Sequence, residues 1–230
     1  MEVLNRIALF STYDFAAVAL LFTLWMIIGW RVEHPSAKKP STSVLMAEYR
    51  KAWMTEMVTR APRVFDAHTL GTLRQGTAFF ASTCMIALGG TLAMIGNAET
   101  LAGVAGDITF ADHPAVVWEF KLLVIALFLT NAFLKFVWSN RLFGYCSVLM
   151  AAVPNDVTHP KAYHRAAQAA EINIIGARSF NRGLRSIYFA LAATAWLAGP
   201  VTLVMAALLT LTVIWRREFA SNSRKILLDD

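Results

Sequence analysis

The stretch AVVWEFKLLVIALFLTNAFLKFVW, residues 115–138, decides the fold class. Trp118 and Trp138 are twenty positions apart in it, which corresponds to about 30 Å of helix at a rise of 1.5 Å per residue. That length matches the hydrocarbon thickness of a bilayer, and tryptophan prefers the two interfaces. The stretch is therefore predicted to be a membrane-spanning helix.

Three further apolar stretches have the same character. The last contains Gly199-Pro200, and a proline inside a helix removes a hydrogen bond and kinks it. We expect one long, kinked fourth span there, with a shallow re-entrant hairpin as the alternative. The predicted fold is an all-α, polytopic membrane protein, a single integral domain over residues 1–230. Its spans lie at about 13–30, 77–96, 115–138 and 186–215.

The composition agrees with this class. The 230 residues are 57% hydrophobic and 16% charged, against about 45–50% apolar and about 25% charged in soluble domains. This excludes a disordered chain, a nucleic-acid-binding domain and an ordinary soluble enzyme. The net charge of +6 comes from basic residues beside apolar stretches, which favours anionic lipid headgroups as partners.

The connectors between the spans differ in charge. Residues 31–75 and 139–185 are rich in Lys and Arg, whereas 96–115 carries acids and no basic residue. Positive connectors stay in the cytoplasm, so we expect an inner-membrane protein with 31–75 and 139–185 cytoplasmic and the N-terminus external. Four spans leave the C-terminus external as well, although it is basic. A fifth crossing would reverse its side.

Two segments outside the spans are predicted to be amphipathic cytoplasmic helices, at about 43–60 and 160–175. Ser43 is the expected N-cap of the first and Gly176 the expected end of the second. The first helix can lie at the membrane interface or dock a partner protein. Its apolar face is formed by Met46, Tyr49, Trp53 and Met57. A helical extension from Trp138 to Pro154 is also expected.

Several short motifs resemble a known family. They are Thr72-Leu73-Arg74, Lys121, Asn140, Asn181-Arg182-Gly183, Tyr188, Leu191 to Trp196 and Gly199-Pro200. The chain resembles the "domain of unknown function 599" proteins, small multi-span membrane proteins of bacteria and plants, from the first span to Phe219. The resemblance implies a multi-span fold and no particular activity, because the family has none established.

Charged and polar residues inside spans are the first site candidates, because they are costly in lipid. Asp14 and Lys121 are expected at similar depth and are a candidate ion pair. In the alternative, Asp14 lies among headgroups and Lys121 extends its ammonium to the interface. Lys121, Asn131 and Lys135 also follow one side of a helix, which favours a path for an anion. Equally, Asn131 can join two helices and Lys135 can reach the interface.

Arg178, Arg182 and Arg185 precede the fourth span near one helix face. They are candidates for binding lipid phosphates, and the alternative is a basic flank that fixes topology. The second span carries small residues that favour close packing within or between subunits, and we expect a homo-oligomer.

No enzyme, metal or cofactor motif is present in the sequence, and we expect neither catalysis nor a cofactor. The leading hypothesis is an oligomeric channel or transporter-like passage for a small solute or anion. The alternative is a non-catalytic scaffold or accessory subunit of a membrane complex, and a membrane-lipid enzyme is third. The sequence names neither the substrate nor a partner.

Overall fold

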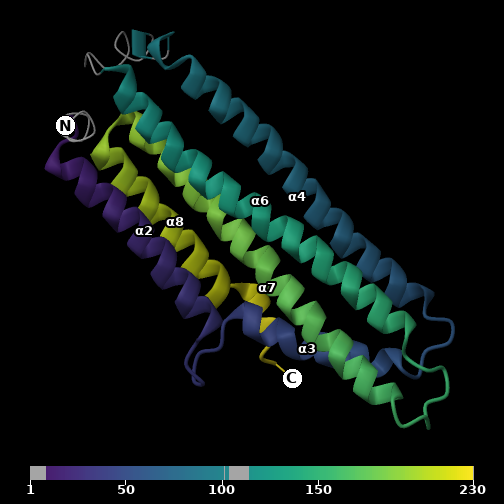
Figure 1. Cartoon of the computed structure of the whole chain (residues 1–230). Coiled ribbons are helices and arrows are strands. Elements are labelled where there is room, and N and C mark those ends of the chain that lie inside the picture. The colour runs from purple at the N-terminus through teal and green to yellow at the C-terminus, as the bar shows by residue number, and fades with distance from the viewer. Residues whose placement is uncertain (1–8, 101, 104–113, 230) are drawn as a thin grey trace. The chain divides into compact units, whose positions relative to one another are not determined.

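The computed structural model describes residues 9–100, 102–103 and 114–229, and every element named within these ranges is a helix. The acidic stretch around Asp107 and Asp112 and the N-terminus itself lie outside the described residues. Figure 1 shows the course of the chain. In order, the helices are α2 (Thr12–Glu33), α3 (Thr42–Met57), α4 (Val64–Gly96), α6 (Ala115–Ala151), α7 (Ala162–Thr194), the 3-10 turn η1 (Ala195–Ala198), α8 (Pro200–Phe219) and α9 (Asn222–Ile226).

Among the described residues, four helices are long and apolar enough to cross a membrane. They are α2, α4, α6, and α8 together with the short α9. The prediction of an all-helical, multi-pass membrane protein is confirmed. α4 and α6 run beyond the predicted spans because no proline interrupts 64–76 or 139–151, and α6 ends shortly before Pro154, as its expected extension does.

The expected break at Gly199-Pro200 is present. α7 ends at Thr194, a 3-10 turn follows, and Gly199 has φ 123°, a left-handed conformation that favours glycine. The Thr202 hydroxyl closes this turn by donating to the carbonyl oxygen of Ala195 at 2.7 Å.

The chain reverses direction at this break. Asn181 in α7 donates to Ser43 Oγ at 3.2 Å, and Ser43 Oγ donates to Glu218 in α8 at 2.8 Å. A continuous helix would separate residues 181 and 218 by about 55 Å, so α7 and α8 run in opposite directions. The single long span predicted at 186–215 is thus refined to two arms. The second arm, α8 with α9, is one of the four helices that are long and apolar enough to cross a membrane, and α7 is not among those four.

The first amphipathic helix begins earlier than predicted. The N-cap of α3 is Ser41 and not Ser43, since Ser41 Oγ accepts from the Val44 N–H at 3.3 Å. Ser41 Oγ also donates to the carbonyl oxygen of Val32 at 2.7 Å, which ties the start of α3 to the end of α2. Ser43 therefore lies inside the first turn, with its hydroxyl available to other helices.

The second amphipathic helix does not stop at Gly176 but continues through it as part of α7. Gly176 lies where α7 contacts α6. A Cβ there would be 3.0 Å from the Phe143 ring, and Ser139 Oγ donates to the Gly176 carbonyl at 2.7 Å. The glycine permits a close approach of two helices here, which outweighs its tendency to end one.

The chain divides into two compact units. The first comprises the chain up to Trp30, Thr83–Ala132 and Leu184–Trp215. Its core is centred on Phe128, whose ring stacks on Phe22 at 5.1 Å and on Phe189 at 6.2 Å. α2, α6 and α7 therefore meet around one buried aromatic side chain.

The second unit comprises Arg31–Ser82, Phe133–Gly183 and Arg216–Asp230. It gathers nearly all of both basic connectors and the C-terminal tail. The tail is held at the start of α3, where Ser43 binds Glu218 and Arg224 Nε donates to the Pro40 carbonyl at 2.8 Å. The apolar core consists of Met54, Met57, Val58, Leu70, Phe143, Cys146, Met150, Val153, Ala162, Ala166, Ala169 and Ala170.

Candidate functional site

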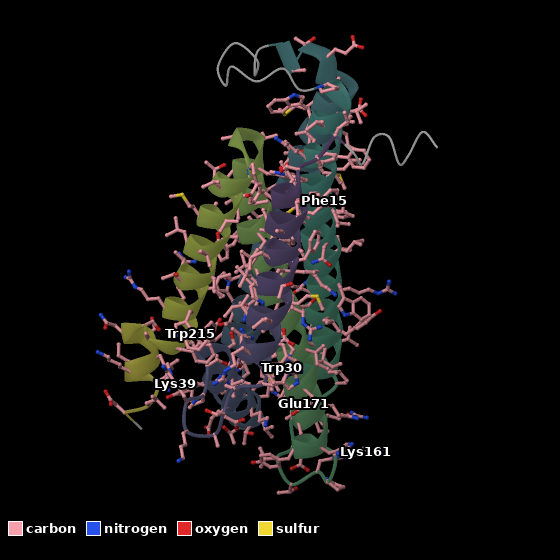
Figure 2. All side chains as sticks on the ribbon, turned by 90° about the vertical axis from the view of Figure 1, so that its left-hand side faces the viewer. Phe15, Trp30, Lys39, Lys161, Glu171 and Trp215 are labelled. Carbon is pink, nitrogen blue, oxygen red and sulfur yellow. The ribbon has the colours of Figure 1, made fainter. Side chains whose placement is uncertain are left out.

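Asp14 lies in the first turn of α2. The next residue, Phe15, lies at the opposite end of the helix from Trp30 (Figure 2). Its carboxylate accepts from the Ser11 hydroxyl at 2.6 Å and from the Ser11 N–H at 3.1 Å, while the Asp14 N–H donates back to Ser11 Oγ. This reciprocal arrangement is a capping box, which fixes the helix start. The other carboxylate oxygen accepts from Trp196 Nε1 at 2.7 Å.

Lys121 lies in the same cluster and is only 4% exposed. Its Nζ is 4.9 Å from the centroid of the Trp118 ring and 5.9 Å from that of Trp196. Attraction between a cation and an indole face compensates part of the cost of burying the ammonium. The structure thus brings Asp14 and Lys121 to one indole, and Trp196 binds the first by its N–H and the second by its ring.

Asp14 and Lys121 attract each other electrostatically, but the ion pairs found among the described residues do not include them. A second donor is also unused, because Trp118 Nε1 is buried without a hydrogen-bond partner. An ammonium and an indole N–H are both donors only. Such a pair suits an anionic ligand.

The other two residues of the predicted polar path have different surroundings. Asn131 Nδ2 donates to Ser186 Oγ at 2.6 Å, joining α6 to α7. This is the helix-joining contact that the sequence leaves open as the alternative to a path. Lys135 is half-buried, and its backbone carbonyl accepts from Ser179 Oγ at 3.0 Å.

The three arginines before the break do not share one role. Arg182 forms a two-point ion pair with Glu33 at the end of α2, and hydrogen bonding to Glu33 raises the pKa of its guanidinium. Arg185 is 5% exposed and lies against Gly29, where a Cβ would be 3.9 Å from Arg185 Nε. Arg178 is exposed. Only Arg178 keeps the surroundings expected of a headgroup-binding side chain.

The apolar face of α3 is divided between the core and the surface. Met57 is fully buried, and Trp53 packs against the same core. Met46 and Tyr49 are 39% and 38% exposed. The half of the proposed docking face near the end of α3 is thus occupied within the chain.

Sequence reasoning missed a buried carboxylate at the start of α4. Asp66 is fully buried and accepts from Trp53 Nε1 at 2.7 Å and from Arg60. Arg63 donates to the carbonyls of Val153 and Pro154 at 2.7 and 2.8 Å. These bonds tie the turn between α3 and α4 to the end of α6.

A second missed group lies between α3, α6 and α7. Arg50 donates to Asn173 Oδ1, and Asn173 Nδ2 lies 3.6 Å from Cys146 Sγ. Burial lowers the pKa of Arg50. The spacing that predicts an amphipathic helix at about 43–60 does not reveal this contact, because Asn173 is distant in sequence. Among the described residues, no group of three or more His, Cys, Asp or Glu is placed to hold a metal ion.

A family model described as "Protein of unknown function, DUF599" matches residues 16–223. The chain belongs to this family. The match includes the stretch from Asn181 to Pro200. In this stretch Asn181 donates to Ser43, Trp196 donates to Asp14, and Gly199 forms the break between α7 and α8. No curated protein and no solved structure matches this chain.

Proposed function

We propose that this DUF599 protein carries or conducts a small anion across the membrane, and that Lys121 binds the anion. The observation that supports this is a lysine buried in a membrane-spanning helix, with its ammonium on two indole rings. Buried intramembrane charges are costly and generally serve a function. The unpartnered Trp118 N–H supplies a second donor for the same ligand.

Asp14 has a positioning role in this proposal. It holds the Trp196 indole through the 2.7 Å hydrogen bond, and that indole in turn faces the Lys121 ammonium. Because Asp14 is already bound by Ser11 and Trp196, it does not neutralise Lys121 by direct contact. The ammonium therefore keeps the capacity to bind an incoming anion.

The experiment is anion flux into liposomes that contain the purified protein, with chloride, nitrate and acetate as probes. Lys121→Gln should lower the flux at least about tenfold, as expected for loss of a charged donor, and Lys121→Arg should retain part of it. Lys135→Gln is the matched control, because it removes a half-buried lysine from the same helix, and it should change the flux less than twofold. Equal fluxes in Lys121→Gln and wild type would refute the role of Lys121.

The proposed location is the inner membrane, with both basic connectors in the cytoplasm. The bonds of the tail to Pro40 and Ser43 support a cytoplasmic C-terminus as well, and this topology requires α7 to be a fifth crossing beside the four apolar helices. Reporter fusions in the first connector and after residue 230 should both report the cytoplasmic side of the membrane. Reports of opposite sides would contradict this topology.

The proposed assembly is a homo-oligomer that packs through α4. Cβ atoms added at Gly89, Gly90 and Gly96 would meet nothing within 4 Å, so the glycines of this helix are free to pack against a second copy. The mass of the protein in detergent, measured by light scattering, tests this, and a monomer in every detergent would refute it.

The scaffold alternative is now limited to the exposed residues of α3. Met46 and Tyr49 are 39% and 38% exposed, and a copurifying protein that is lost in a Met46→Ser, Tyr49→Ser variant would favour this alternative.

A further inference from the structure

Two arginines from different helices of the second unit, Arg74 in α4 and Arg141 in α6, lie close to Gly144. Asn140 Nδ2 in α6 donates to the Arg74 carbonyl and to Thr77 Oγ1 in α4, both at 2.9 Å. These bonds fix the two helices to each other at this level. The Arg74 side chain lies across α6 at Gly144, where a Cβ would be 3.9 Å from the guanidinium carbon.

The second arginine is Arg141 in α6. Its Nε donates to the Tyr145 hydroxyl, and its guanidinium lies 5.6 Å from the Tyr145 ring centroid. Residues three apart on a helix are neighbours, so Arg141 borders Gly144, over which Arg74 extends. Tyr145 holds Arg141 by Nε and by its ring face, which leaves the terminal nitrogens free to bind.

Neither guanidinium is neutralised by a carboxylate. The ion pairs within the described part of the chain use Arg60, Arg182 and Lys51, not Arg74 or Arg141, and both of these side chains are exposed. Like charges repel, so an anion bound between the two guanidinium groups would stabilise this arrangement.

The depth of the pair suits a lipid phosphate. Arg141 follows Trp138 by three residues, and Arg74 precedes the start of the second predicted span at Thr77 by three residues. Tryptophan at the end of a span marks the interface, where lipid phosphates lie. A guanidinium fork matches the geometry of phosphate oxygens.

We propose that Arg74 and Arg141 form a binding site for the phosphate of an anionic lipid headgroup, with Gly144 leaving room for Arg74. The site is separate from the Lys121 cluster and does not depend on anion passage. This site replaces Arg182 and Arg185 as the candidates for binding lipid phosphate. Arg182 is already paired with Glu33, and Arg185 is buried.

The test is native mass spectrometry of the full chain released from detergent with phosphatidylglycerol or phosphatidylcholine. Wild type should retain phosphatidylglycerol, and Arg74→Gln, Arg141→Gln should weaken its binding at least about tenfold. Arg216→Gln is the matched control, since it removes an exposed arginine of the same unit to which no lipid contact is assigned, and it should change the binding less than twofold. An equal loss of phosphatidylglycerol binding in Arg216→Gln would show that the effect comes from net charge alone and would overturn the site.

A charge-neutral variant gives an independent result. Gly144→Leu fills the space under the Arg74 guanidinium, so it should weaken phosphatidylglycerol binding while the net charge stays the same. Unchanged binding in both Gly144→Leu and the double arginine variant would overturn the proposal. Competition with inorganic phosphate separates the two sources of the ligand. Displacement of the lipid by phosphate at equal concentration would refute the lipid assignment.

Discussion

Replacing Gly183 by alanine should destabilise the protein, although alanine favours a helix. A Cβ at Gly183 would lie 2.9 Å from two atoms of the Phe136 ring, well inside van der Waals contact. That ring is fully buried and packs against Phe80 and Phe180, each at 5.3 Å between centroids, so it cannot retreat. Overpacking costs about 1–3 kcal/mol and the helix gains about 0.5–1 kcal/mol. The net loss is about 1.5 kcal/mol.

Thermal unfolding in detergent measures this loss. For a chain of this size, about 1.5 kcal/mol corresponds to a fall in Tm of about 3–6 °C. Gly71→Ala is the matched control, because a Cβ at Gly71, also inside a helix, meets nothing within 4 Å. It should raise the Tm by about 2 °C through helix propensity alone.

The cause of the loss is tested by a double variant. Phe136→Leu removes the ring that the new methyl group meets, so Gly183→Ala should cost nothing further in that background. If Gly183→Ala and Gly71→Ala shift the Tm equally, or if the loss persists without the ring, the close contact between α6 and α7 is not what requires a glycine.

Two further substitutions test ionic contacts of the second unit. Asp66→Ala should lower the unfolding free energy by about 2–3 kcal/mol, because Trp53 Nε1 and Arg60 lose a fully buried acceptor, and Tm in detergent checks this against the wild type. Glu33→Gln should cost at most about 1 kcal/mol, because Arg182 is 46% exposed. The difference in Tm should shrink as salt is added, and a loss that salt leaves unchanged would contradict a surface ion pair.

The helical, membrane-spanning nature of the fold follows from the sequence, because apolar length and interfacial tryptophans are local properties. The ends of helices follow less well. Gly176 reads as a stop, yet it continues a helix, since its contact with Phe143 depends on a segment distant in the chain. Ser41 and Ser43 are equally good N-caps by residue type, and the bond from Ser41 to Val32 decides between them.

The candidate sites show the same limit. Asp14 and Lys121 stand out because charge is costly in a span, and both indeed lie in one cluster. Trp196, which joins them, lies in the 3-10 turn before Gly199, and the hydropathy of the sequence does not reveal its contact with either residue. For the arginines, the sequence predicts a shared role that the structure does not show. Periodicity groups Arg182 with Arg178, but it does not reveal that Glu33 forms an ion pair with Arg182.

The bond between Ser43 and Glu218 has a consequence for biosynthesis. Its two residues are 175 positions apart, so at about 5–20 residues per second the ribosome needs roughly 9–35 s to supply the second after the first. During that time the Ser43 hydroxyl at the start of α3 lacks its acceptor, Glu218. A nascent chain that stops before Arg216 never forms this hydrogen bond. Quality-control proteases would therefore encounter, in every truncated product, a first connector that is not bound to the C-terminal tail.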